Sequence, residues 1–512
     1  MYNNFEPGKR LLVEVDFYLK CSQKVQRNER FKMRSSKILI SGQWLEAGDG
    51  AKCANRNPAD LAQLNPAFPL ATVEDANRAV AAARQAQAAW STLPPPGRGE
   101  VLDKASQMIA ARSEELAALI TREEGKTLAE SRAEVDRARD IFRYFAGEGW
   151  RNGGSVYPAN MKGEMLYSKR EPLGVVTIIT PWNFPIAIPA WKIAPALIYG
   201  NTVIFKPAQA GSLIGLELAG ILVEAGLPPG VLNCITGEGG KLSAALVENP
   251  SVNGISFTGS YTVGTHIYSQ AIKNLTRVQV EMGGKNPLVV MDDADLKLAV
   301  DLVVRAGFGL TGQACTATSR VIVHQGIAKQ FSLALQEAAS LLKVGNGLES
   351  GTQMGPAVNQ GQLDTDLEYI KIGQDEGAKL LVGGKNTQEG GYFIQPAVFD
   401  FVDISMRIAR EEIFGPVISL IHAQDLEDAI SKANAIAFGL SAGIVTRDLH
   451  NAFTFADQVE AGVVKINEAT TGLALQVPFG GFKHSSANTF KEQGPAAIEF
   501  YTRTKTVYIG HG

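Results

Sequence analysis

Hydrophobic and polar positions change their spacing along this chain, and each spacing predicts a different kind of element. Between residue 72 and about residue 147, apolar residues recur every three or four positions, which predicts three successive amphipathic helices. The first begins at Thr72-Val73-Glu74-Asp75, which resembles a capping box, and Pro94-Pro95-Pro96-Gly97 ends it. We expect the second helix over about 98–124 and the third over about 128–147.

Short apolar runs replace the helical spacing after Gly174. Most are followed by a loop or a helical pattern, and this alternation predicts βαβ units with a parallel sheet covered on both faces. The runs are 175–179, 202–206, 231–235 and 254–257, and a further short strand is predicted over 277–280. Such sheets bind ligands at the carboxyl ends of their strands. Cys234 lies within one run, so packing is its expected role.

A second α/β region follows the first. Its helical patterns occupy about 295–309, 327–342 and 426–435, and its strand-like runs include 417–420 and 442–445. Two α/β regions in sequence predict two lobes with a cleft between them. The last stretch, 500–509, alternates like an edge strand. Because an exposed strand edge tends to pair, this stretch is a candidate contact with another subunit.

Composition and charge exclude several classes of protein. The chain has 512 residues, of which 45% are hydrophobic and 20% charged, as is ordinary for a soluble globular enzyme. A net charge of −3 provides no basic surface for nucleic acid or membranes. No apolar run approaches about 18 residues, so we expect no transmembrane helix. Four scattered cysteines without a CxxC pair and six isolated histidines predict no metal site and a reducing, cytoplasmic setting.

Residues 1–36 are charged and irregular compared with the rest of the chain. Their apolar stretch, 11–17, is interrupted by two acids and makes a poor signal-peptide core. Met33 begins a more conventional start that runs into Ile38-Leu39-Ile40. We therefore expect an N-terminal extension without a catalytic part, and loss of activity in a protein that starts at Met33 would contradict this.

One cysteine stands in a setting that favours chemistry. Cys315 lies among small and polar residues over 311–320, after an apolar helical pattern and before Val321-Ile322-Val323. Near a loop-to-helix boundary, backbone N–H groups and the helix dipole lower the pKa of a thiol below its free value of about 8.5. We expect a reachable nucleophile with a lowered pKa; the alternative is a small residue that merely packs.

Five further residues could serve the same chemistry, and each has an ordinary alternative. Gly259 and Ser260 precede a predicted helix whose free N–H groups suit a phosphate, although a plain helix cap looks the same. Lys206 ends a strand, where it either reaches a ribose or phosphate or stays solvated. Glu281 is a candidate general base or a surface carboxylate beside a turn. Asn183 is a candidate oxyanion donor or a turn residue.

Taken together, the motifs of this chain resemble those of the aldehyde dehydrogenase superfamily from about Ile38 to Ile509. They occur in the family's order: Pro181-Trp182-Asn183-Phe184-Pro185, Phe257-Thr258-Gly259-Ser260, Glu281-Met282-Gly283-Gly284-Lys285, Gly312-Gln313-Ala314-Cys315 and Glu411-Glu412-Ile413-Phe414-Gly415-Pro416. The resemblance implies that Cys315 is the nucleophile, Glu281 the general base and Asn183 an oxyanion donor. The thiolate would form a thiohemiacetal and then a thioester, which water activated by Glu281 would hydrolyse.

The resemblance also implies a bound NADP or NAD. The residues it assigns are Lys206 and Glu412 for the riboses, Gly259 and Ser260 for the pyrophosphate, Trp182 along the cofactor site, Phe414 near the nicotinamide, and Glu492 as a possible proton relay. Gln209 stands where many NAD-preferring relatives carry a glutamate. Because an amide does not repel a 2′-phosphate, we expect NADP to be tolerated or preferred. A strong preference for NAD would contradict this expectation.

The fold that the resemblance implies is α/β, with two Rossmann-like lobes and a small β extension for oligomerisation. The expected parts are an N-terminal extension (1–36), a cofactor-binding domain (37–149 and 172–283), a catalytic domain (284–483) and oligomerisation segments (150–171 and 484–512). A homodimer or homotetramer is expected, with a small aldehyde as substrate.

Two stretches, 315–320 and 478–486, look most like the α-ketoglutaric semialdehyde (2,5-dioxopentanoate) dehydrogenases. The favoured reaction is therefore oxidation of 2,5-dioxopentanoate to 2-oxoglutarate. Trp191 stands where succinate-semialdehyde dehydrogenases often carry an arginine, which counts against a specialist of that kind. That activity and a broad-range aliphatic aldehyde dehydrogenase remain alternatives. Arg143 and Lys483 are candidate carboxylate anchors, although surface roles are favoured for both.

A cysteine thioesterase or esterase is the alternative from another class, because Cys315 and Glu281 together could also cleave esters. Reduction of NAD(P) by the protein discriminates between the two. The presence of Lys206, Ser260 and Glu412 favours the dehydrogenase.

Overall fold

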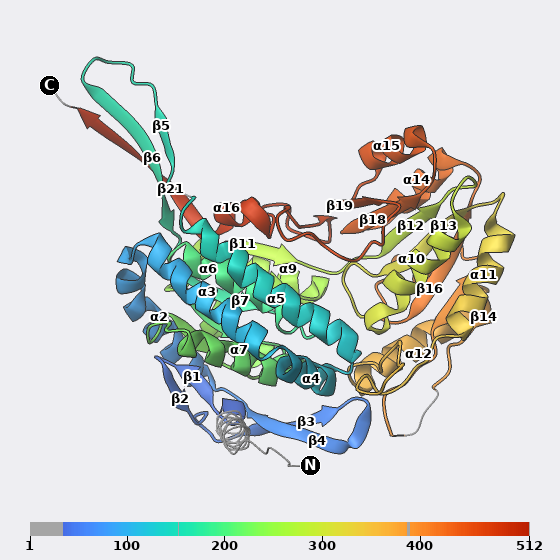
Figure 1. The fold of residues 1–512 in the computed structure, drawn as a ribbon, viewed down its shortest axis with the longest axis horizontal. Coiled ribbons are helices and arrows are strands. Elements are labelled where there is room, and N and C mark those ends of the chain that lie inside the picture. The colour runs from blue at the N-terminus through green and yellow to red at the C-terminus, as the bar shows by residue number, and fades with distance from the viewer. Residues whose placement is uncertain (1–33, 152, 387–389, 511–512) are drawn as a thin grey trace, which may run out of the picture.

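The computed structural model describes residues 34–151, 153–386 and 390–510 (Figure 1). Figure 1 shows one α/β lobe in blue and green, a second in yellow and red, and a thin arm that projects from the first. The predicted fold class is confirmed, because each lobe is built on a mainly parallel seven-stranded sheet. The expectations for a start at Met33 concern residues outside the described ranges. No helix within those ranges is long and apolar enough to cross a membrane.

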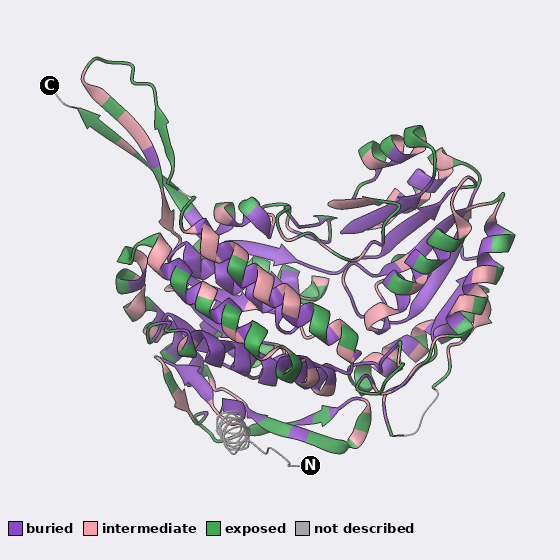
Figure 2. Cartoon of the chain, viewed as in Figure 1, coloured by how far each residue is buried: buried purple, intermediate pink, exposed green. Residues whose placement is uncertain are grey.

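The sheet of the first lobe has the strand order β11-β10-β7-β8-β9-β1-β2, and its first five strands are parallel. Its strands are β1 (Ile38–Ile40), β2 (Gln43–Leu45), β7 (Val175–Ile179), β8 (Thr202–Lys206), β9 (Leu232–Cys234), β10 (Gly254–Thr258) and β11 (Arg277–Glu281). The five parallel strands are buried almost throughout (Figure 2), as expected for apolar runs covered on both faces. Cys234 is fully buried in β9, in line with its predicted packing role.

Helices cover both faces of this sheet. One group packs with the core that contains Val176 and Val203, and the other with the core that contains Val175 and Ile204. The first group is α3 (Pro95–Ala111), α4 (Ser113–Glu124), α5 (Leu128–Glu148), α6 (Ala187–Ile198) and α7 (Ser212–Glu224). The second is α2 (Val73–Thr92), α8 (Gly239–Val247) and α9 (Tyr261–Ala271). The predicted capping box at Thr72 is confirmed, with Asp75 as its acid.

The second predicted helix is wrong as a single element, because it divides at Arg112. This residue has φ −119° and ψ 16°, outside helical geometry, and it separates α3 from α4. Its guanidinium lies 2.7 Å from the buried carboxylate of Glu217 on α7. Apolar spacing along the chain does not encode this contact between distant segments, which is why the sequence predicted one continuous helix.

The sheet of the second lobe has the order β14-β15-β16-β13-β12-β18-β19, and only β14 is antiparallel to its neighbour. Its strands are β12 (Asn286–Val290), β13 (Thr318–His324), β14 (Lys379–Val382), β15 (Ala397–Asp400), β16 (Val417–Ala423), β18 (Ser441–Val445) and β19 (Val463–Ile466). Its helices are α10 (Leu296–Phe308), α11 (Ala328–Ser340), α12 (Gln360–Asp375), α13 (Arg407–Arg410), α14 (Leu426–Asn434) and α15 (Leu449–Gln458).

Four smaller units of the described chain lie outside the two large sheets. The arm is a three-stranded antiparallel sheet of β5 (Ser155–Tyr157), β6 (Glu164–Pro172) and β21 (Thr502–Gly510). The others are the hairpin β3 (Lys52–Asn57) with β4 (Asp60–Pro69), the pair β17 (Phe438–Gly439) with β20 (Phe482–Lys483), and the helix α16 (Ala497–Tyr501). The predicted C-terminal strand is confirmed as β21, and within this chain it pairs with β6 along nine residues.

Candidate active site

The loops that carry the sequence motifs meet between the two lobes. From the first lobe they follow the carboxyl ends of β7, β8, β10 and β11, where the predicted ligand-binding edge lies. From the second lobe they precede the amino ends of β13 and β16. The two sets touch, because Nδ2 of Asn183 donates to the carbonyl of Gln313 at 2.9 Å. Asn183 therefore lies beside the turn that carries Cys315.

Cys315 lies in a turn between the short 3-10 helix η3 (Gly309–Gly312) and β13. Leu310 and Thr311 have φ of 53° and 59°, so the chain reverses here in a left-handed conformation that side chains adopt rarely. Asn286 on β12 fixes the far side of the turn, since its Nδ2 donates to the Cys315 carbonyl at 2.8 Å. Cys315 as a whole residue is half-buried.

The predicted lowering of the Cys315 pKa is wrong for this state of the protein. Burial, and then the negative charges of Glu412, Glu281 and Glu492, raise the pKa of the thiol to about 12. The cause of the difference is local, because Cys315 is followed by a strand rather than a helix and faces three carboxylates. The thiol therefore needs a base, or a change in these charges, before it can attack.

Glu281 and Glu492 form a buried pair of carboxylates. Oε2 of Glu281 accepts a hydrogen bond from the Gly481 N–H at 3.0 Å, and Glu492 forms an ion pair with Lys192 of α6. One oxygen of each carboxylate has no hydrogen-bond partner among the described residues. Burial, and then the charge of Glu492, raise the pKa of Glu281 well above its ordinary value. Glu281 is consequently a stronger base than a solvated carboxylate.

Glu412 lies over the glycine pair that follows β11. Its Oε1 accepts from the Gly284 N–H at 3.0 Å, and a methyl group on Gly283 would lie 2.0 Å from both carboxylate oxygens. A side chain at position 283 would therefore displace Glu412. Phe414, with φ 63°, packs edge to face against Trp182 with ring centroids 5.5 Å apart. This contact joins the 411–416 loop to the loop that carries Asn183.

The residues expected to hold a dinucleotide lie along the carboxyl edge of the first sheet. Lys206 is buried and donates to the Pro207 carbonyl at 3.0 Å, and burial lowers its pKa to about 8. Ser260 caps the start of α9, and Gln209 is exposed after β8. A lysine with further N–H donors, a helix start and the Glu412 carboxylate suit a diphosphate with ribose hydroxyls. No group of three metal-ligating side chains occurs in the described ranges.

The two candidate carboxylate anchors, Lys483 and Arg143, have surroundings that differ from those of the site residues. Lys483 forms an ion pair with Glu460 and donates to the Asn434 carbonyl at 2.8 Å. Arg143 lies exposed on α5. Both observations favour the surface roles over the carboxylate-anchor roles. Trp191 is buried, and its ring lies 6.1 Å from that of Phe479.

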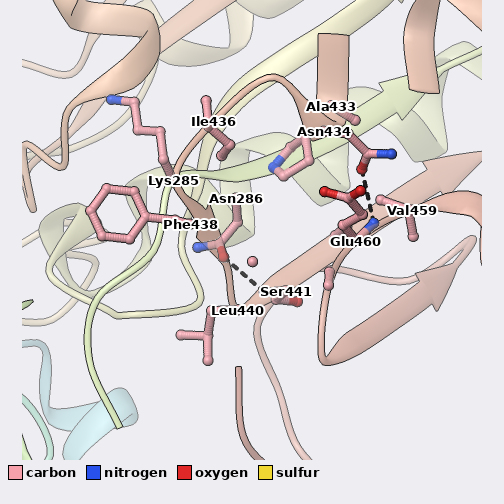
Figure 3. Close-up of a pocket in the computed structure, with 14 residues that line it drawn as sticks. Lys285, Asn286, Ala433, Asn434, Ile436, Phe438, Leu440, Ser441, Val459 and Glu460 are labelled. Carbon is pink, nitrogen blue, oxygen red and sulfur yellow. Dashed lines mark hydrogen bonds between the residues drawn. The ribbon is translucent and has the colours of Figure 1, made fainter. Parts of the chain in front are cut away.

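A small pocket lies beside Asn286, the residue that holds the Cys315 carbonyl in the turn (Figure 3). Asn286 connects the two places, because its Oδ1 accepts from the Ser441 N–H at 3.0 Å while its Nδ2 holds the Cys315 carbonyl. Figure 3 shows Asn434 and Glu460 linked at the opposite wall. Cys315 is not among the described residues that line this pocket.

Sequence reasoning missed the charged residues Lys126, Glu134 and Lys192. Each is buried: Lys126 contacts Asn183, Lys192 contacts Glu492, and Glu134 binds the start of α6 shortly after Asn183. Lys126 and Glu134 flank or belong to an amphipathic helical pattern, where a charged side chain is normally expected to be exposed. Lys192 breaks an otherwise apolar helix in the sequence, and that break was the available sign.

Comparison with known proteins shows the family of this chain. Residues 44–507 match the model of the aldehyde dehydrogenase family, and the chain belongs to that family. An α-ketoglutaric semialdehyde dehydrogenase of Bacillus subtilis (strain 168) is 45% identical over 475 residues, 92% of this chain and 97% of that protein. A 2,5-dioxopentanoate dehydrogenase of Saccharolobus solfataricus is 44% identical over 473 residues, 92% of this chain and 98% of that protein. A betaine aldehyde dehydrogenase of Staphylococcus aureus, solved with NAD+, superposes with a TM-score of 0.91 at 34% identity, covering 93% of this chain and 95% of that one.

Proposed function

We propose that this protein oxidises an aldehyde to its carboxylate with NAD(P), through a covalent intermediate on Cys315. The observation that carries the proposal is the meeting of Cys315, Asn183 and the Glu281–Glu492 pair between the two lobes. Family membership supports the reaction class. The NAD+ complex of the Staphylococcus aureus relative supports the type of cofactor.

Each candidate site residue has its own role in the proposed reaction. Cys315 reacts as the thiolate: its proton passes to water, and the sulfur then bonds to the carbonyl carbon. The second N–H of Asn183 Nδ2 and the Cys315 amide stabilise the oxyanion. Lys206, Ser260 and Glu412, with Gly259, Trp182 and Phe414 around them, would hold NAD(P), which would accept the hydride from the carbonyl carbon and so leave a thioester on Cys315. Glu281, whose pKa is raised, then takes a proton from the water that attacks the thioester carbon, the carboxylate product leaves Cys315 as the thiolate, and Glu492 passes the proton onward.

The favoured substrate is 2,5-dioxopentanoate, which would yield 2-oxoglutarate. Two relatives at 44–45% identity over 92% of this chain carry names for this activity. Trp191, where an arginine would suit succinate semialdehyde, remains consistent with the choice. The amide of Gln209 is the basis for expecting NADP to be used as well as NAD.

We also propose that the protein forms a homodimer or homotetramer in a reducing, cytoplasmic setting. The arm exposes apolar side chains, with Val156 74% and Tyr508 70% accessible, and β19 leaves one edge of the second sheet unpaired within the described chain. An arm strand that adds to β19 of a second copy would cover both surfaces. Cys53, Cys234 and Cys315, the cysteines in the described ranges, are free thiols. The expected domain limits, with a boundary near residue 283, remain part of this proposal.

An aldehyde panel assayed with both cofactors tests the proposed function. We expect reduction of NADP and NAD with 2,5-dioxopentanoate at a kcat/KM above that with succinate semialdehyde or simple aliphatic aldehydes. Release of carboxylate from a thioester or ester, with no reduction of either cofactor by any aldehyde, would instead support a cysteine hydrolase.

A further inference from the structure

Lys126 is a buried ammonium in contact with the backbone of Asn183. It lies between α4 and α5, and its side chain is 1% exposed. Its Nζ donates to the Asn183 carbonyl at 2.6 Å and to Oε2 of Glu134 at 2.7 Å. The same ammonium lies 4.8 Å from the ring centroid of Phe184, the next residue along. The Lys126 ammonium therefore binds the backbone at Asn183, the residue that carries the proposed oxyanion donor.

Glu134 of α5, the ion-pair partner of Lys126, binds the start of α6. Its Oε1 accepts hydrogen bonds from the Ile186 N–H at 2.9 Å and the Ala187 N–H at 3.1 Å. These are free N–H groups at a helix start, where a carboxylate is favourable. The segment from Asn183 to Ala187 is thus tied at both ends to a single ion pair.

The charge balance keeps Lys126 ionised despite its burial. Burial alone would lower the pKa of Lys126, but the carboxylates of Glu124 and Glu134 raise it above its ordinary value. Glu124 lies 3.3 Å from Nζ, and burial raises its own pKa to about 8. Buried ion pairs of this kind contribute little net stability compared with an apolar replacement, so stability alone does not explain its presence.

We propose that Lys126 is a positioning residue for the oxyanion donor: by holding the Asn183 carbonyl, it directs the Asn183 amide toward the aldehyde bound to Cys315. On its other side, Asn183 contacts Gln313, two residues before the nucleophile. Asn183 is therefore fixed from both lobes. The inference rests on the proposed role of Asn183 and adds the residue that sets its orientation.

A double-mutant cycle tests this inference. Lys126→Met is made in the natural chain and in Asn183→Ala, and the first-turnover rate of NAD(P)H formation is measured at saturating cofactor. Loss of an oxyanion donor lowers such a rate by about 10²–10³. We expect Lys126→Met to lower it by roughly tenfold when Asn183 is present and by less than about twofold in Asn183→Ala, because both changes remove the same interaction.

The outcomes separate this inference from the proposed function. Equal losses in both backgrounds, or no loss in the natural chain, would overturn the role of Lys126 alone. If Asn183→Ala retains the full rate, this contradicts the oxyanion role of Asn183 and, with it, the positioning role of Lys126.

A second pair of variants covers the case in which Lys126→Met does not fold. Glu134→Gln keeps an oxygen for the α6 N–H groups but loses the charge facing Lys126. Its matched control is Glu123→Gln, since Glu123 is equally buried and accepts from the Leu213 and Ile214 N–H groups at the start of α7, at 2.8 and 3.0 Å. We expect a several-fold slower first turnover in Glu134→Gln only, and equal rates in the two variants would overturn the inference.

Discussion

The reactivity of Cys315 is governed by the carboxylates around it. Among the charges that raise the pKa of the thiol, that of Glu412 has the largest effect. Burial raises the pKa of Glu412 itself to about 7. Glu412 is therefore charged above about pH 7 and opposes thiolate formation there. Its position over Gly283 depends on the absence of a side chain at that residue.

At this scale we predict that Glu412→Gln accelerates alkylation of Cys315 by iodoacetamide. At pH 9 the expected gain is roughly threefold to tenfold, because removal of a nearby negative charge lowers the thiol pKa. Below pH 6 the gain should shrink, since Glu412 is protonated there. Glu411→Gln is the control, because this partly exposed neighbour binds Arg407 and Tyr369 instead. An equal rate in Glu412→Gln and the natural protein at pH 9 would contradict the assignment.

At the element scale, helix α12 supports the loop that carries Glu412 and Phe414. Gln362 donates to the Ile413 carbonyl at 3.0 Å and to Oδ1 of Asp366 at 2.8 Å. Asp366 is fully buried, and a methyl group on Gly415 would lie 1.9 Å from its Oδ1. The helix and the loop are therefore packed without space for a side chain between them.

Burial raises the pKa of Asp366 to about 8, and this predicts a specific pH dependence of stability. An unfolded aspartate ionises near pH 4, whereas the folded one resists ionisation until about pH 8. As the pH rises from about 4 to about 8, the free energy of unfolding therefore falls, compared with that of a variant whose residue at this position never ionises. We expect Asp366→Asn to raise Tm more at pH 8 than at pH 5.

Thermal unfolding of Asp366→Asn and of the control Asp364→Asn, which lies exposed on the same helix, measures this effect. The control should show little change at either pH. A gain from Asp366→Asn that is equal at both pH values would show that Asp366 is not held uncharged.

The helices and strands also show which element bounds the spacing of apolar residues can predict. The apolar runs gave the strands β7, β8 and β10 to within a residue or two, because fully buried strands are continuous in hydrophobicity. The division at Arg112 and the turn before Cys315 were not predictable in the same way. The first depends on an ion pair with Glu217, and the second on positive φ at Leu310 and Thr311, which are not residues that usually adopt it.

Over the whole molecule, the site exists only because the two lobes meet. The motifs identified which residue types take part, but the order of the strands decides that Glu281, Asn183 and Cys315 lie together. The thiol pKa could not be inferred from neighbours in the sequence, because the carboxylates that raise it are distant in the chain. The contact of Lys126 with Asn183 spans 57 residues and gave no local pattern.

The arm gives a prediction at the same scale. If it adds a strand to a second copy, lysines at Val156 and Tyr508 should weaken assembly, because charge would replace exposed apolar surface. Light scattering should give a mass of at least two chains for the natural protein and a lower one for Val156→Lys/Tyr508→Lys. Lys241→Ala, an exposed change outside the arm, is the control. A natural protein with the mass of one chain would contradict the proposed assembly.

Mass spectrometry of Glu281→Gln after incubation with aldehyde and cofactor tests the central claim most directly. Since the amide cannot activate water, the account predicts that an acyl group accumulates on the peptide that contains Cys315, close to one per chain. Cys315→Ala should carry no acyl group and form no NAD(P)H. Full turnover by Cys315→Ala, or an acyl group on any other residue, would contradict the account.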